Sequence, residues 1–258
     1  MTILIEKNYP TFTIIIDNPE VKNAVDGQTA QELGDAFNQF ENDPSALVAI
    51  LWGAHGVFCS GANLKAIAGD RGNKVNKKGY GPMGPTRMQL SKPVIAAISG
   101  YAVAGGLELA LWCDLRIAEK SAIFGVFCRR YGVPLIDGGT VRLPRLIGLS
   151  RAMDMILTGR PVKAEEAFHW GLANRIVEDG TSKLEAEKLA REIAHFPQIC
   201  MRNDRLSVYD QVGLPINKAM MKEFVYGLNT LNSGEFLEGS KAFIEGYGKH
   251  GKFNNQLK

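Results

Sequence analysis

Short apolar runs and helical segments alternate along the first half of this 258-residue chain. The runs at 11–16, 47–52 and 94–98 are rich in β-branched and aliphatic residues and predict buried strands. Between the first two runs, residues 28–41 have the apolar spacing of a helix. Strands that alternate with helices in this way indicate an α/β fold.

The second half of the chain differs, because the strand pattern fades after residue 151. Apolar stripes at helical spacing predict helices at 150–157, 164–170, 182–195 and 215–231. A hydrophobic content of 45% is enough for a full core. We therefore expect a core domain over residues 1–200 and a helical region over residues 201–258.

Composition and charge argue against several classes of function. The formal net charge is +3 and the basic residues are scattered, which argues against nucleic acid as a partner. No apolar run approaches the ~20 residues of a membrane helix, and Met1–Glu6 lacks a signal-peptide pattern, so we expect no membrane association and a cytoplasmic location. The four cysteines are widely spaced, and they predict neither a metal site nor a disulfide framework.

Within the segment 99–114, residues 102–113 form an apolar run that contains a single carboxylate, just after two glycines. Gly105 and Gly106 lack a Cβ, so a ligand can approach their N–H groups closely. If a helix begins there, its first amides have no partner inside the helix and can hold an anion or a developing oxyanion. Glu108 then lies about one turn inside that helix, where it can exchange a proton with an atom next to that oxygen.

A second segment of small residues precedes this one in the chain. Ser60, Gly61 and Ala62 leave the backbone open, so it offers another N–H donor. Together, this segment and the glycine pair resemble the paired signatures of the crotonase, or enoyl-CoA hydratase/isomerase, superfamily. The resemblance extends from residues 18–24 to residues 238–243, so it covers nearly the whole chain.

This resemblance implies a crotonase-like spiral of repeated ββα units with a helical C-terminal oligomerisation region. In that family the C-terminal helices assemble trimers, often paired into hexamers, so we expect a homotrimer or hexamer; alternatively, the apolar stripes cover the protein's own core. The resemblance also implies an acyl-CoA substrate and no cofactor besides the coenzyme A of that substrate. The amides of Ala62 and Gly105 then hold the thioester oxygen and Glu108 handles a proton, unless these residues serve only packing and a helix surface.

The chain departs from the hydratases of the family at the second acid. Those enzymes carry a second glutamate after a Phe-Gly, and here that position falls on Cys128, whose ordinary pKa of ~8.5 leaves it mostly protonated. Asp137 lies nearby, close to an aspartate that some relatives with hydrolase or isomerase activity carry. It is therefore a candidate second acid; alternatively, it caps a helix or a turn. Arg129 and Arg130 are expected either to pair with Asp137 or Glu108, or to lie at the surface.

The remaining site residues follow from the resemblance. Residues 69–85 correspond to the border of the acyl pocket, with Tyr80 and Met83 as contacts of the acyl chain; alternatively, this is an ordinary solvated loop. Asn63 replaces an acid that usually follows Gly-Ala, a change that we expect to affect structure more than chemistry. Candidate substrate contacts are Lys22, Ala24, Gly61, Leu64, Gly106, Cys128, Phe243 and Lys252. The last two would reach a nucleotide bound to a neighbouring subunit, unless the C-terminal lysines form only an exposed tail.

Three classes of function fit these residues. Enoyl-CoA hydratase is the expected activity, with Glu108 acting on the water or the α-proton and Asp137 as the second acid. The loss of the second glutamate favours a second class, which is double-bond isomerisation, or hydrolysis of a C–C or thioester bond, on the same enolate platform. The third class is a protein that binds acyl-CoA without turnover, and the retained Glu108 and glycine pair argue against it.

Overall fold

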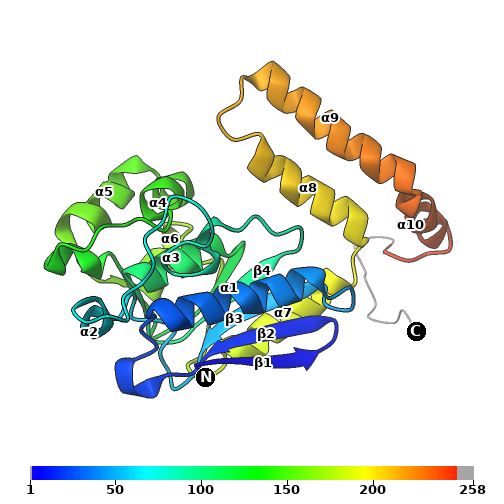
Figure 1. Ribbon diagram of the computed structural model, residues 1–258. Coiled ribbons are helices and arrows are strands. Elements are labelled where there is room, and N and C mark those ends of the chain that lie inside the picture. The colour runs from blue at the N-terminus through cyan, green and yellow to red at the C-terminus, as the bar shows by residue number, and fades with distance from the viewer. Residues whose placement is uncertain (1, 249–258) are drawn as a thin grey trace. The chain divides into compact units, whose positions relative to one another are not determined.

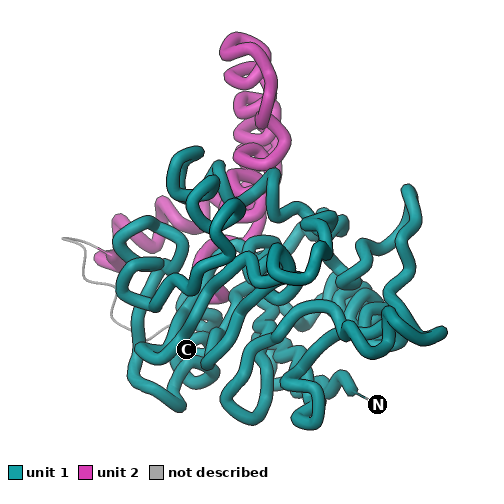
Figure 2. The backbone as a smooth tube through the Cα atoms, turned by 90° about the vertical axis from the view of Figure 1, so that its left-hand side faces the viewer, with its two compact units in different colours: residues 1–193 teal, residues 194–258 magenta. Residues whose placement is uncertain are grey.

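The computed structural model describes residues 2–248, and the chain divides into two compact units (Figures 1 and 2). Unit 1 comprises Met1–Ile193 and unit 2 comprises Ala194–Lys258. The boundary expected between residues 200 and 201 falls instead inside helix α8 (Gln198–Asp210). The units divide earlier because the last helix of unit 1, α7 (Ser182–Ala194), already ends at this point.

Unit 1 is built on two sheets (Figure 1). The larger sheet has the order β1-β2-β3-β4-β6-β9 and is parallel except for β1. Its strands are β1 (Ile3–Asn8), β2 (Thr11–Ile16), β3 (Val48–Gly53), β4 (Val94–Ile98), β6 (Leu115–Glu119) and β9 (Arg175–Val177). The smaller sheet contains β5 (Tyr101–Val103), β7 (Ile123–Gly125) and β8 (Val162–Lys163). The strands predicted at 11–16, 47–52 and 94–98 are confirmed as β2, β3 and β4.

From β4 to β7, consecutive strands alternate between the two sheets, and a helix follows each pair of strands. β4 joins the larger sheet, β5 joins the smaller one, and α3 (Gly105–Trp112) comes next. β6 and β7 repeat this order before the short helix η3 (Phe127–Tyr131) and α4 (Gly139–Ile147). An earlier turn runs from β3 through a bridge between Cys59 and Ala102 to α2 (Leu64–Ile67). The predicted α/β spiral of ββα units is therefore confirmed.

Helices cover both faces of the larger sheet, which explains why every residue of β2 is buried. On one face lies α1 (Gly27–Asn42), where the ring centroids of Phe12 and Phe40 are 5.6 Å apart. On the opposite face, Lys183 of α7 lies over the ring of Trp52 in β3. The helix predicted at residues 28–41 is confirmed as α1.

The other predicted helices also occur. Those expected at 150–157, 164–170, 182–195 and 215–231 are α5 (Leu149–Thr158), α6 (Ala164–His169), α7 and α9 (Ile216–Ser233). The sequence did not predict α4, α8 or α10 (Glu235–Ile244), nor the single-turn helices η1 (Pro19–Val21) and η2 (Pro85–Arg87).

The described part of unit 2, which ends at residue 248, contains α8, α9 and α10, and α8 and α9 lie side by side (Figure 1). Asn203 Nδ2 of α8 donates a hydrogen bond to Thr230 Oγ1 of α9 at 2.9 Å. Glu235, the first residue of α10, accepts a hydrogen bond from Cys200 N at 2.7 Å. This carboxylate satisfies an amide in the first turn of α8, where helix amides have no internal partner.

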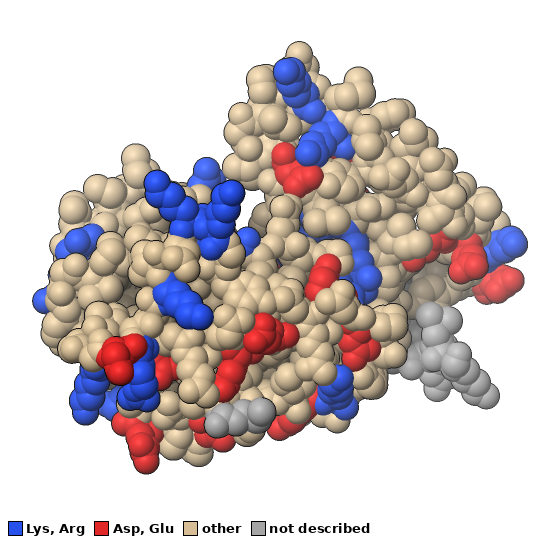
Figure 3. All heavy atoms as spheres, viewed as in Figure 1, with Lys and Arg blue, Asp and Glu red and all other residues tan. Residues whose placement is uncertain are grey.

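Charges of both signs are mixed on part of the face that Figure 3 shows. Along the lower part of the face in Figure 3, Lys and Arg side chains lie among Asp and Glu side chains. Of the helices in the described part of the chain, none combines the length and the apolar character that crossing a membrane requires.

Candidate active site

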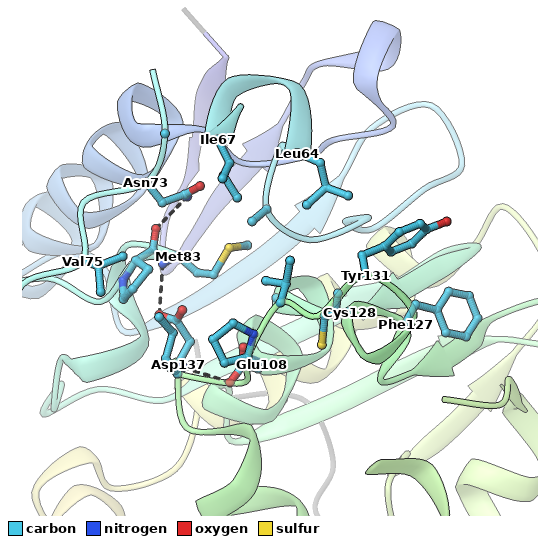
Figure 4. A pocket seen from close by; sticks show the side chains of 18 of the residues that line it. Leu64, Ile67, Asn73, Val75, Met83, Glu108, Phe127, Cys128, Tyr131 and Asp137 are labelled. Atoms are coloured by element: carbon cyan, nitrogen blue, oxygen red, sulfur yellow. Dashed lines mark hydrogen bonds between the residues drawn. The ribbon is translucent and has the colours of Figure 1, made fainter. Parts of the chain in front are cut away.

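A cavity of about 520 Å³ lies in unit 1 between α2, the N-terminal end of α3 and η3 (Figure 4). Most of its wall is apolar, and the aliphatic side chains there are Leu64, Ile67, Val75, Met83, Val133 and Ile136. A few polar side chains interrupt this wall, among them Glu108, Cys128 and Asp137. A mainly apolar cavity with a few polar groups is the usual form of a small-molecule site.

Two backbone amides reach this cavity from separate segments. Ala62 and Gly105 both line it. Val25 N donates to Gly61 O at 2.8 Å and Asn63 N donates to Val25 O at 2.9 Å, so the amide of Ala62 points away from this bridge. Within residues 2–248, neither Ala62 N nor Gly105 N donates a hydrogen bond. Both amides are therefore available to a ligand.

The close approach of these two segments depends on glycine. Gly61 has φ +100°, and a Cβ there would lie 3.1 Å from Gly105 N. A Cβ on Gly106 would lie 2.1 Å from Cys59 O, which leaves room only for hydrogen. Ala104 adopts φ 53° and ψ −126°, a strained conformation for a residue with a Cβ, at the start of α3.

We expect Gly106→Ala to lower the free energy of unfolding by about 1–3 kcal/mol, because the added Cβ forces α3 away from Cys59. Gly227→Ala is the matched control, since nothing lies within 4 Å of a Cβ at this position inside α9. That change should raise the stability by up to about 1 kcal/mol. Urea unfolding measures both effects. Wild-type stability of Gly106→Ala would show that the contact with Cys59 O is not tight.

Glu108 belongs to α3 and is only 2% exposed. Its Oε1 accepts hydrogen bonds from Asp137 N at 2.9 Å and from Gly139 N at 2.8 Å. Within residues 2–248, Oε2 accepts no hydrogen bond, so it is the oxygen available to a ligand. Burial raises the pKa of this carboxyl to about 7, and the charge of Asp137 contributes in the same direction. A carboxyl with a pKa near 7 can give or take a proton at neutral pH.

The pKa of Glu108 makes stability depend on pH. Its carboxyl titrates near 4.5 in the unfolded chain and near 7 in the folded one, so between these values the folded state binds more protons. We expect this group to lower the free energy of unfolding by up to about 3 kcal/mol as the pH rises through that window. Glu108→Gln should lack this dependence, as urea titrations across the window would measure. The same pH dependence in both proteins would mean that burial does not shift this pKa.

Asp137 lies in the turn before α4, is 4% exposed and lines the cavity. Its Oδ1 accepts hydrogen bonds from Met83 N at 3.0 Å and from Thr86 Oγ1. Its second oxygen, Oδ2, points into the cavity (Figure 4). Burial raises the pKa of this carboxyl, and its hydrogen bonds oppose the rise. Its interpretation as a helix cap is wrong, because Gly138 occupies the position before α4 and Asp137 binds residues 83–86 instead.

Cys128 lies in η3 and lines the cavity. Burial raises the pKa of its thiol, and the charge of Glu108 raises it further. The thiol is therefore protonated at neutral pH and supplies no charge to the cavity.

The two arginines after Cys128 do not reach a cavity carboxyl. Arg129 Nε donates to Ile156 O at 3.0 Å, and Arg130 Nη2 donates to Gly159 O at 2.8 Å. Of the two alternatives for these arginines, the pairing with Asp137 or Glu108 is therefore wrong, and the surface position is confirmed because both residues are exposed. Both guanidinium groups instead fasten η3 to the end of α5.

A family model described as enoyl-CoA hydratase/isomerase matches residues 6–253 of this chain. The chain belongs to this family. It is 37% identical over 242 residues to a carnitinyl-CoA dehydratase of Proteus mirabilis, which covers 90% of this chain and 91% of that protein. It is 32% identical over 247 residues to the enoyl-CoA hydratase EchA19 of Mycobacterium tuberculosis, covering 94% and 93%. A solved enoyl-CoA hydratase from Mycobacterium tuberculosis superposes with a TM-score of 0.90 at 34% identity, covering 95% of this chain and 96% of that chain.

The substrate contacts predicted from the enoyl-CoA hydratase/isomerase family divide by position. Leu64 and Cys128 line the cavity. Gly61 and Gly106 lie behind it, where they allow its two backbone segments to touch. These four positions fit a role at the site, and their contact with a substrate stays a prediction.

The other predicted contacts lie apart from the cavity wall. Lys22 is exposed, and its carbonyl accepts a hydrogen bond at 3.2 Å from the amide of Ser60, which does line the cavity. Ala24 is buried and is not part of the wall. Phe243 belongs to α10 of unit 2 and is 57% exposed, and Lys252 lies outside the described residues.

The segment 69–85 borders the cavity, as the family resemblance implied. Met83 lines the wall. Tyr80 does not contact the cavity, because its hydroxyl binds Asn38 and Asp35 of α1. Its predicted contact with an acyl chain is therefore wrong, and its hydroxyl fastens the segment to α1.

Sequence reasoning missed several residues of the wall and its support. The wall also contains Ile67, Asn73, Val75, Val133 and Ile136, while Thr86 and Arg142 support the turn at Asp137. Part of the wall had one signal in the sequence: Val75 and Met83 are apolar residues inside the otherwise polar segment 69–85. Asn63 caps α2 by accepting hydrogen bonds from Lys65 N and Ala66 N, which fits its expected structural role. In residues 2–248, no group of three or more His, Cys, Asp or Glu side chains is placed to hold a metal ion.

Proposed function

We propose that the protein adds water reversibly across the Cα–Cβ double bond of a 2-enoyl-CoA thioester. The observation that carries this proposal is the placement of Glu108, whose carboxyl has a pKa of about 7 and shares a cavity with the amides of Ala62 and Gly105. The relatives support the reaction class, since the names carnitinyl-CoA dehydratase and enoyl-CoA hydratase describe the loss and the gain of water.

In the proposed reaction the thioester oxygen lies between the amides of Ala62 and Gly105. Attack of water at Cβ moves negative charge onto this oxygen and forms an enolate. An N–H donor in such a position stabilises the charge by about 2.7–4 kcal/mol. The donors are in place before the reaction, because the contacts at Gly61 and Gly106 fix both segments.

Two carboxyls handle the protons. Asp137 takes a proton through Oδ2 as the water oxygen attacks Cβ, and Glu108 delivers a proton through Oε2 to Cα. The sum is the addition of one water, after which proton exchange resets both carboxyls. A pKa near 7 suits Glu108 to this role, because both its protonated and its ionised forms are populated at neutral pH. The proposed reaction uses no metal or redox cofactor, and coenzyme A enters only as part of the substrate.

Cys128 favours a second candidate, the isomerisation of an enoyl-CoA double bond. This neutral thiol lines the cavity at the position where the hydratases of the family carry their second glutamate. Isomerisation moves one proton between two carbons, so a single base such as Glu108 is sufficient.

The test is an assay of the purified chain with crotonyl-CoA that follows the loss of absorbance of the conjugated thioester. Hydration is expected. A parallel assay supplies a 3-enoyl-CoA and follows the gain of the same absorbance. Conjugated product without hydration would replace the hydratase by an isomerase. Tight binding of both thioesters without turnover would overturn both activities and leave an acyl-CoA-binding protein.

The proposed setting of this enzyme is a cytoplasmic homotrimer or a dimer of such trimers. Helix α9 supports the assembly because its large apolar side chains are 43–77% exposed: Ile216, Met220, Met221, Phe224, Val225, Leu228 and Leu231. Apolar surface of this extent marks an interaction site. The four cysteines are free thiols, which fits a reducing compartment.

A further inference from the structure

The guanidinium of Arg142, a half-buried residue of α4, joins two segments behind the cavity wall. Its Nη1 donates to Asp137 O at 2.9 Å, and its Nη2 donates to Thr86 O at 2.7 Å. One planar side chain therefore spans the turn before α4 and the helix η2. Arginine suits this task because its donors diverge in a fixed plane, whereas a lysine ammonium is a single point of charge.

Both of the joined segments touch the candidate reacting groups. Asp137 N and Gly139 N hold Oε1 of Glu108. In the other direction, Oδ1 of Asp137 holds Met83 N, and the Met83 side chain packs where a Cβ of Gly105 would lie. The contacts form a closed ring from α3 through the turn to residues 83–86 and back to α3.

Gly138 makes the approach of the guanidinium possible. It has φ +98°, and a Cβ there would lie 2.1 Å from Arg142 Nη1. Any other residue at this position would push the guanidinium off the turn. The contact between the turn and Arg142 therefore requires a glycine at position 138. A chance contact at the surface would have no such requirement.

We propose that Arg142 is a positioning residue of the reaction, which holds the turn 137–139 against residues 85–87 so that the two amides stay on Glu108 Oε1. This inference rests on the proposed function for its effect on turnover. Loss of the guanidinium frees the turn, and the carboxyl of Glu108 then samples orientations that do not face the substrate. A displacement of this kind lowers the rate even where the reacting group itself is intact.

The charge of Arg142 provides a second readout. The titratable or charged groups around the two carboxyls are Glu108, Asp137, Cys128, Arg87 and Arg142. Arg142 lowers the pKa of both carboxyls. Removal of its charge should therefore move the pKa of Glu108 upward, while a lysine in its place should leave that pKa nearly unchanged.

The experiment compares Arg142→Met, Arg142→Lys and the control Arg145→Met in the full chain. Arg145 lies on the same helix and is exposed, and within residues 2–248 its guanidinium donates only to Val141 O, a carbonyl of its own helix. We expect Arg142→Met to lower kcat by about 10- to 100-fold and to shift the pH profile of kcat/KM upward. Arg142→Lys should show the loss of kcat without the shift. Arg145→Met should show neither.

Two further measurements need no turnover. Carbon NMR follows the titration of Glu108, and hydrogen exchange follows the amides of Asp137 and Gly139. An upward pKa and faster exchange in Arg142→Met would support the positioning role even if the wild-type chain hydrates nothing, an outcome that would overturn only the proposed function. The positioning role would be overturned if Arg142→Met kept the wild-type kcat. It would also be overturned if Arg142→Met and Arg145→Met lost kcat to the same extent. A drop in thermal stability with kcat, pKa and exchange unchanged would overturn it as well.

Discussion

Glu108→Gln should lower kcat/KM for enoyl-CoA hydration by about 10²- to 10⁴-fold, the range that general acid–base catalysis contributes. The glutamine Oε1 can still accept hydrogen bonds from Asp137 N and Gly139 N, so the position of the side chain is retained. The atom that replaces Oε2 becomes an amide nitrogen, which neither takes nor gives a proton at neutral pH. Initial rates with crotonyl-CoA measure the loss.

The chain offers a matched control for this substitution. Glu119 is also buried, at 5% exposure, and its Oε1 accepts hydrogen bonds from Ser182 N and Ser182 Oγ outside the cavity. Glu119→Gln removes a buried carboxylate with the same kind of partners, and its rate should match that of the wild type. If both variants retain wild-type rates, Glu108 is not the proton carrier. If both lose activity equally, the loss reflects damage to the fold.

The sequence predicted the parts of the fold that one continuous apolar run determines. The runs 47–52 and 94–98, which form β3 and β4, contain only apolar residues and stand out without knowledge of their partner strands. The helices α8 and α10 could not be predicted in this way. Four polar residues in a row at 202–205 interrupt the apolar spacing of α8, and Gly239 lies in the middle of α10, where glycine disfavours a helix.

The candidate site was predictable where one segment supplies the signal. A lone carboxylate in an apolar run after two glycines identified Glu108, Gly105 and Gly106. The site was not predictable where a hydrogen bond joins segments that are distant in the sequence. Arg142 and Thr86 are 56 positions apart, and Asp137 and Met83 are 54 positions apart. For the same reason the sequence left two alternatives open for Arg129 and Arg130 and did not indicate that Arg142 contacts the turn at Asp137.

Asp137→Asn should lower kcat for hydration by about 10²-fold, the lower end of the range for general acid–base catalysis, because Glu108 remains. The asparagine Oδ1 can still accept from Met83 N and Thr86 Oγ1, so only the atom that faces the cavity changes. Asp26→Asn is the matched control, because Asp26 caps α1 by accepting from Thr29 N and does not line the cavity. Its rate should equal that of the wild type.

A second substitution, Asp137→Ala, separates proton transfer from structure. It also removes the hydrogen bonds to residues 83–86, which should cost about 1–3 kcal/mol of stability in addition to the loss of rate. If Asp137→Asn hydrates crotonyl-CoA like the wild type while Asp137→Ala is impaired, Asp137 only fastens two segments together. Hydration would then depend on Glu108 alone. If Asp137→Asn loses hydration but still isomerises a 3-enoyl-CoA, the carboxyl of Asp137 is the group that activates water, because isomerisation needs no water.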